Sequence, residues 1–183
     1  IFPANHYTMG GIWVDYELMT SFPGLFAIGE AILSDHGANR LGASALMQGL
    51  ADGYFVLPYT IQNYLADQIQ VPRFSTDLPE FIATENAIYE KMEKLKSING
   101  KHSVDSIHKK LGHIMWEFVG MARTKESLEK ALTDIQKVKK EFWRYVRIPG
   151  EYKELNIELD KALRLDDLIE LGMLMALDGL KRN

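Results

Sequence analysis

The spacing of apolar and polar residues divides the chain into a β-like N-terminal part and a longer helical part. Residues 12–16 alternate in polarity as a half-buried strand does, and residues 25–28 form a short, continuous apolar run. Such a run is typical of a strand that is buried on both faces, as in a parallel sheet. It ends at Glu30, where open α/β sheets bind ligands at the carboxyl ends of their strands. Taken alone, Glu30 also fits a solvated loop residue.

Helical periodicity begins after the β-like part. It predicts one helix over residues 43–56, and a second from Pro58 to about residue 69, because proline breaks a helix but is tolerated in a first turn. Residues 72–76 read as a connector. We therefore divide the chain into residues 1–70 and residues 71–183.

The second part is charged and strongly helical. Ser103 and Thr124 are expected to cap the starts of two helices, and Asn99-Gly100 is expected to end one in a left-handed turn. Four amphipathic helices are predicted, over residues 77–98, 103–121, 124–148 and 153–180. Helices of this kind joined by short turns pack as an antiparallel bundle. The expected fold class is mixed and mainly α, with a strand–loop–helix region before the bundle.

Composition removes several classes of function. The 183 residues carry a formal net charge of −4, which argues against nucleic acid as a main partner. The chain has no cysteine, which excludes disulfides, thiol nucleophiles and thiolate metal sites. His102, His108 and His113 lack the spacing of three or four that would place ligands on one helix face, so no metal site is expected. No apolar run is long enough to suggest a membrane span.

The loop over residues 37–46 is the strongest candidate for chemistry. Its Arg40 is the one Lys or Arg among residues 1–70, which hold six acidic residues. Gly37 and Gly42 permit a tight backbone path, and small residues follow where the helix begins. Unsatisfied N–H groups at a helix start, beside a guanidinium, form an anion site. The alternative without a ligand is a helix start whose small residues pack in a core, with Arg40 as an ordinary surface charge.

Three motifs in order resemble one family. They are HYTMGG at residues 6–11, GLFAIGE at residues 24–30 and HGANRLG at residues 36–42. Together they resemble the flavoprotein subunit of succinate dehydrogenase and quinol:fumarate reductase, and the helical remainder is similar to that family's C-terminal bundle. The resemblance implies that residues 1–70 are the C-terminal part of an α/β FAD-binding domain. L-aspartate oxidase is a relative with a similar loop.

The resemblance also implies roles for individual residues. His6 and Arg40 would hold the carboxylates of succinate or fumarate, and Glu30 would accept hydrogen bonds from hydroxyls of FAD. Ala45 and Leu46 would meet the flavin ring through their backbone N–H groups. The family often carries Asn-Ser-Leu at this point, whereas this chain has Ser44-Ala45-Leu46, which leaves the backbone contact but not the serine hydroxyl.

Other parts of the family's machinery have no counterpart in this sequence. A Gly-x-Gly-x-x-Gly motif, a flavin-linking histidine, the proton-transferring arginine and a capping domain are all absent, so no catalytic residue is assigned. We expect the chain to be an inactive fragment of a flavoprotein that passes electrons to an iron–sulfur subunit. The resemblance places that complex, with its membrane anchor subunit, at the cytoplasmic face of the cell membrane. The alternatives are a fragment of L-aspartate oxidase and a non-catalytic helical interaction module.

Overall fold

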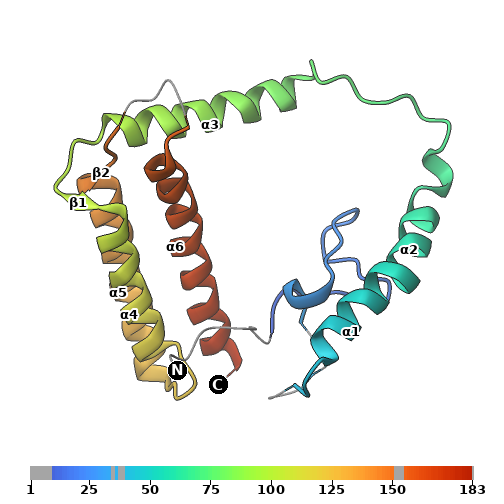
Figure 1. Ribbon diagram of the computed structural model, residues 1–183, viewed down its shortest axis with the longest axis horizontal. Coiled ribbons are helices and arrows are strands. Elements are labelled where there is room, and N and C mark those ends of the chain that lie inside the picture. Colours follow the sequence, from blue (N-terminus) through green and yellow to red (C-terminus); the bar gives the residue numbers. More distant parts are fainter. Residues whose placement is uncertain (1–9, 34–35, 37–39, 151–154, 183) are drawn as a thin grey trace. The chain divides into compact units, whose positions relative to one another are not determined.

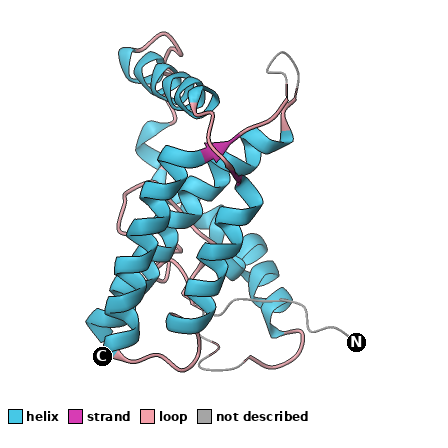
Figure 2. Cartoon of the chain, turned by 90° about the vertical axis from the view of Figure 1, so that its left-hand side faces the viewer, coloured by secondary structure: helices cyan, strands magenta, loops and turns pink. Residues whose placement is uncertain are grey.

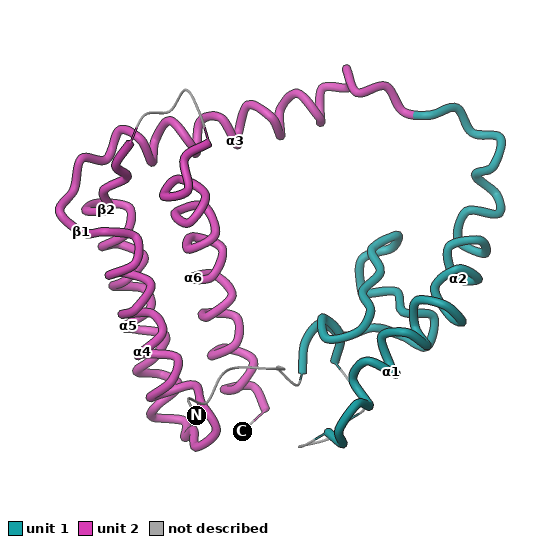
Figure 3. Tube along the Cα trace, viewed as in Figure 1, with its two compact units in different colours: residues 1–73 teal, residues 74–183 magenta. Residues whose placement is uncertain are grey.

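The chain forms two compact units. The computed structural model describes residues 10–33, 36, 40–150 and 155–182. Packing of the backbone separates residues 1–73 from residues 74–183, coloured separately in Figure 3. Among the described residues, no helix is both long and apolar enough to cross a membrane.

The β-like region of the first unit is held by single bridges rather than by regular strands. Ile12 pairs in parallel with Ile32, and Met19 pairs in antiparallel with Phe26. The prediction of strands over residues 12–16 and 25–28 is therefore wrong at the level of the described backbone. Leu25 is 54% exposed, so its apolar run is not buried on both faces. The physical reason is that a buried strand needs a paired neighbour on each side, and the described part of this unit supplies isolated pairs.

Gly11 allows two segments to touch. The Ile12 N–H donates to the Ala31 carbonyl at 2.9 Å, and the Leu33 N–H donates to the Ile12 carbonyl at 2.7 Å. A Cβ on Gly11 would overlap the carbonyl oxygen of Ala31. The second glycine of the HYTMGG motif is thus required for close approach of the backbone.

Helices of the first unit follow the predicted ranges closely. Helix α1, Ser44–Ala51, continues into a π-helical turn, Asp52–Val56, and then into α2, Leu57–Tyr64. Pro58 is the second residue of α2 and directly follows the π-helical turn, so its missing N–H falls where the helical hydrogen-bond pattern changes. A short 3₁₀ turn, Ala66–Gln68, follows α2.

The second unit contains four helices and one small parallel sheet. The helices are α3, Pro79–Ser97; α4, Val104–Phe118; α5, Lys125–Tyr145; and α6, Ile157–Arg182. Strands β1, His102–Ser103, and β2, Val146–Arg147, pair in parallel, where no strand was predicted.

Three helices form the core and the fourth crosses over them. Figures 1 and 2 show α4, α5 and α6 packed along one another, with α3 across the end of this three-helix bundle near the small sheet. This arrangement differs from the predicted antiparallel bundle of four helices. The difference has a simple cause, since Leu95, near its C-terminal end, is the one residue of α3 that is buried. The main core cluster includes Ile107, Leu128, Ile135, Phe142, Leu165 and Ile169.

The predicted caps are present, and α3 ends within one residue of its predicted end, but the predicted left-handed turn after it is absent. The Ser103 hydroxyl accepts from the Ser106 N–H at 3.2 Å, and Thr124 forms a capping box with Ser127. Gly100, in contrast, does not adopt a left-handed conformation. A Cβ on Gly100 would overlap the backbone of Tyr145. This glycine therefore lets the chain after α3 pass close to β2.

Candidate functional site

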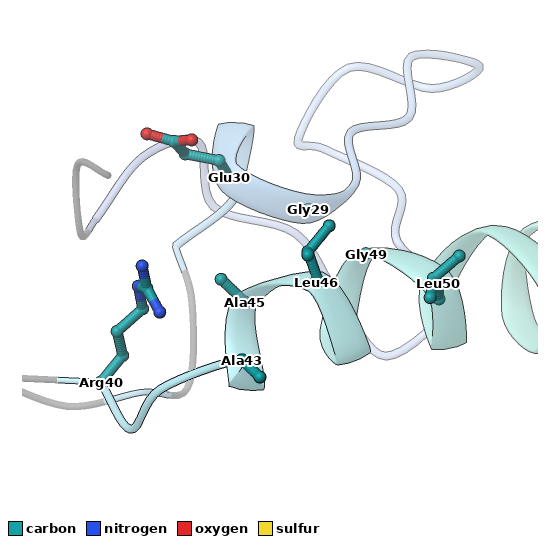
Figure 4. A pocket seen from close by; sticks show the side chains of 8 residues that line it. All are labelled: Gly29, Glu30, Arg40, Ala43, Ala45, Leu46, Gly49 and Leu50. Carbon is teal, nitrogen blue, oxygen red and sulfur yellow. The ribbon is translucent and has the colours of Figure 1, made fainter. Parts of the chain in front are cut away.

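A cavity lies between a short turn and the N-terminal half of α1. It has a volume of about 570 Å³ (Figure 4). The turn is a 3₁₀ helix, Gly29–Ala31, and Gly29 adopts a φ of 61°, which favours glycine. The cavity is lined by Gly29, Glu30, Arg40, Ala43, Ala45, Leu46, Gly49 and Leu50.

Gly29 and Gly49 allow the 3₁₀ turn and α1 to approach each other closely at one wall of the cavity. A Cβ on either Gly29 or Gly49 would lie 3.8 Å from the Cα of the other, so the two backbones face each other without side chains between them. Leu46, which is 76% exposed, and Leu50 supply apolar surface on the same side of α1. The result is a mainly apolar cavity with a few polar groups at one end, as is usual for organic ligands.

The start of α1 carries free hydrogen-bond donors. No side chain caps this helix, and Ala43 precedes it in a left-handed conformation with a φ of 64°. The Ser44 N–H donates to the Leu41 carbonyl at 3.3 Å, and the Met47 N–H donates to the Ala43 carbonyl at 3.1 Å. Between them, the N–H groups of Ala45 and Leu46 have no acceptor among the described residues. Such groups, with the helix dipole, favour an anionic or electron-rich atom.

The hydroxyl of Ser44 is already used by the loop. Its Oγ donates to the Leu41 carbonyl at 2.7 Å. Arg40 adds a second contact to this carbonyl, from Nη1 at 3.3 Å. Both hydrogen bonds hold the tight path into α1, so the loop presents backbone donors rather than the serine hydroxyl.

Glu30 and Arg40 place opposite charges at the same end of the cavity. In Figure 4, Arg40 extends from the loop before α1 toward the side on which Glu30 lies. Glu30 is exposed and Arg40 is half-buried, so both side chains can reach a ligand in the cavity. A guanidinium suits a carboxylate, and a carboxylate suits hydroxyl groups.

Four of the five residues chosen from the sequence thus surround one cavity. Glu30, Arg40, Ala45 and Leu46 all line it, whereas His6 lies outside the described residues. Sequence reasoning missed the contribution of Gly49. Its position four residues after Ala45, on the same helix face, was the available signal. Within the described residues, no group of three or more His, Cys, Asp or Glu side chains could hold a metal ion.

Comparison with known families divides the chain in a similar way. Residues 1–46 match the FAD binding domain family, and residues 108–183 match the family described as fumarate reductase flavoprotein C-term. All four described site residues, from Glu30 to Leu46, fall inside the first match.

Comparison with individual proteins extends the likeness to the whole chain. The chain is 33% identical to the succinate dehydrogenase flavoprotein subunit of Bacillus subtilis over all 183 residues. It is 28% identical, also over 183 residues, to the L-aspartate oxidase of Yersinia pestis. These alignments span 31% and 30% of the two relatives. A solved structure of quinol-fumarate reductase with menaquinol molecules is also similar, with a TM-score of 0.78 and 26% sequence identity. This match covers 97% of the chain described here and 30% of the matched chain in that structure.

Proposed function

Because the chain belongs to the family of succinate dehydrogenase and fumarate reductase flavoprotein subunits, we propose that its protein interconverts succinate and fumarate, with FAD as the hydride carrier. The observation that supports this proposal is the cavity itself. It gathers around one space Glu30 from one motif, Arg40 from the next, and Ala45 and Leu46 from the helix start that follows.

The residues present fit FAD. The glycine pair and the side chains of Leu46 and Leu50 supply mainly apolar surface against which a planar ring could pack. The free N–H groups of Ala45 and Leu46 would donate to polar ring atoms, and Glu30 would accept from hydroxyl groups. A helix start stabilises nearby negative charge by about 0.3–1 kcal/mol, or up to about 2 kcal/mol in a partly buried site. This end of α1 would therefore favour the reduced, anionic form of the ring.

Arg40 would bind the dicarboxylate. Its planar guanidinium can donate two parallel hydrogen bonds to one carboxylate, which fixes the orientation of the substrate as well as its position. His6 would hold the substrate beside it. Neither residue is assigned a proton transfer, so their role is to bind and orient.

The solved relatives suggest how the electrons leave. They include a quinol-fumarate reductase with menaquinol and a Mycobacterium smegmatis succinate dehydrogenase with UQ1. The protein would pass electrons to an iron–sulfur subunit. Together with a membrane anchor subunit, it would then lie at the cytoplasmic face of the cell membrane as a peripheral part of the complex.

The substitution Arg40→Lys tests the substrate site in the flavoprotein that contains this chain. Lysine keeps the charge but loses the two-pronged contact. The loss of hydrogen bonds to a charged group is worth about 1.5–3 kcal/mol, which is roughly ten- to a hundredfold in kcat/KM. FAD content should not change, because Glu30 and the start of α1 carry the proposed cofactor contacts. The measurement is succinate oxidation kinetics with flavin content determined on the same samples.

Arg73→Lys is the matched control, because Arg73 is exposed and lies outside the cavity in the same unit. It should leave both kinetics and flavin content unchanged. Normal turnover by Arg40→Lys, or loss of flavin together with activity, would show that Arg40 does not hold the substrate.

L-aspartate oxidase is the second candidate, since the alignment to the Yersinia pestis enzyme also spans the whole chain. Its name implies L-aspartate as the substrate, a dicarboxylate that Arg40 could bind in the same way. Oxidation of L-aspartate rather than succinate by the purified protein would favour this candidate. A protein that binds neither FAD nor a dicarboxylate would instead be a helical interaction module.

A further inference from the structure

Asp52 makes a long-range contact beside the cavity without lining it. The Gly29 N–H donates to its Oδ2 at 3.3 Å, across 23 residues of sequence. Asp52 is half-buried and lies just after α1, at the first position of the π-helical turn. It therefore ties the turn on one side of the cavity to the helix on the other.

The local backbone explains why Asp52 reaches this N–H. Asp52 follows Gly49 by three residues, which places both on the face of the helix that looks toward Gly29. Gly29 and Gly49 approach closely because neither has a side chain. A Cβ on Gly53, the residue after Asp52, would lie 3.9 Å from Ile28 Cδ1, which is an ordinary contact distance. π-helical turns are rare and often occur at functional sites, and this one begins with the carboxylate that holds the turn.

The hydrogen bond matters because Glu30 directly follows Gly29. Gly29 has a φ of 61°, and it begins a 3₁₀ turn of three residues. A turn of three residues has few internal hydrogen bonds. The hydrogen bond from the Gly29 N–H to Asp52 therefore restricts the position of the Glu30 backbone, from which the Glu30 side chain extends. Fixing the N–H of Gly29 thus fixes the direction from which Glu30 enters the cavity.

We propose that Asp52 is a positioning residue for the cofactor site: its carboxylate holds the Gly29 N–H and so aims Glu30 at the hydroxyl groups of FAD. This inference rests on the proposed function. It adds a residue that lies after the matched FAD binding domain segment, which ends at residue 46.

The experiment measures FAD affinity by reconstituting the apo form of the flavoprotein that contains this chain. Asp52→Ala removes the acceptor and should weaken FAD affinity about tenfold, as expected for one lost hydrogen bond to a charged group. Asp52→Asn keeps a side-chain oxygen that can accept, and its affinity should stay within about threefold of the wild type. Asp67→Ala is the matched control, because it removes a carboxylate from an exposed turn of the same unit.

A double-substitution cycle separates positioning from a general structural effect. If Asp52 acts through Glu30, then Asp52→Ala should cause little further loss of FAD affinity in a protein that already carries Glu30→Ala. Fully additive losses would overturn the proposal. A tenfold loss of FAD affinity in Asp52→Asn would also overturn the proposal. This second variant keeps the proposal testable even if Asp52→Ala does not fold.

Failure of this inference differs visibly from failure of the proposed function. If the wild-type protein binds no FAD, then the proposed function falls. If the wild type binds FAD and Glu30→Ala weakens it, but Asp52→Ala behaves like Asp67→Ala, then the positioning role alone is refuted.

Discussion

Asp166 joins three helices of the second unit, and its removal should loosen α3. Its Oδ1 accepts from Trp143 Nε1 on α5 at 2.9 Å, and its Oδ2 pairs with Lys91 Nζ on α3 at 2.8 Å. The Asp166 side chain is 14% exposed. Lys94 of α3 lies over the Trp143 ring, 4.5 Å from its centre. Apart from Leu95, α3 has no buried residue, so these polar contacts carry much of its attachment.

The expected cost of Asp166→Ala follows from the two contacts. Leaving the part-buried indole N–H without its charged acceptor costs about 1.5–3 kcal/mol. The ion pair to Lys91 is partly solvated and adds about 0–1 kcal/mol. The free energy of unfolding should therefore fall by about 1.5–4 kcal/mol, which corresponds to a Tm lower by roughly 5–20 °C for a unit of this size.

The pKa of Lys91 gives this contact a definite dependence on pH. Partial burial acts to lower the pKa of Lys91, but hydrogen bonds and charges from Asp166 and Asp167 outweigh it and raise the pKa above its ordinary value of 10.5. A lysine with a raised folded pKa stabilises fully below its unfolded pKa. The contribution should therefore be constant through neutral pH and disappear as the pH rises beyond 10.5.

Urea unfolding followed by circular dichroism measures the cost, and hydrogen exchange locates it. The amides of α3 should lose protection more than those of α5. Asp178→Ala is the control, because Asp178 forms an exposed ion pair with Arg182 within α6. The reasoning fails if Asp166→Ala destabilises the protein no more than this control, or if α3 keeps its protection.

Two further predictions concern the backbone and the division into units. Ala43→Gly should raise the free energy of unfolding by up to about 1 kcal/mol, because alanine at a φ of 64° is strained and glycine is not; a denaturant titration that shows a loss instead would contradict this. Residues 74–183 should fold alone with cooperative helical melting, because they contain the main core cluster. A non-cooperative melt by circular dichroism would show that this core needs the first unit.

The sequence by itself determined the helices and the neighbourhood of the site. Helix starts at Ser103 and Thr124 could be predicted because a side-chain cap is a local interaction between residues three positions apart. The motifs likewise placed Arg40 near the start of α1, because Arg40 precedes Ser44 by four residues, which span at most about 14 Å. Both results depend on interactions within a short stretch of chain.

Contacts between residues that are far apart in the sequence became visible only in the tertiary structure. Gly100 was expected to end a helix, but its role is to clear the backbone of Tyr145, which lies 45 positions away. The hydrogen bond from Gly29 to Asp52 and the packing of α3 across the bundle are of the same kind. The periodicity of a helix shows that it has an apolar face but does not show which partner covers that face. In the same way, the apolar run at residues 25–28 does not show which segments pair with it. The structure shows isolated β-bridges in this region where a sheet was predicted.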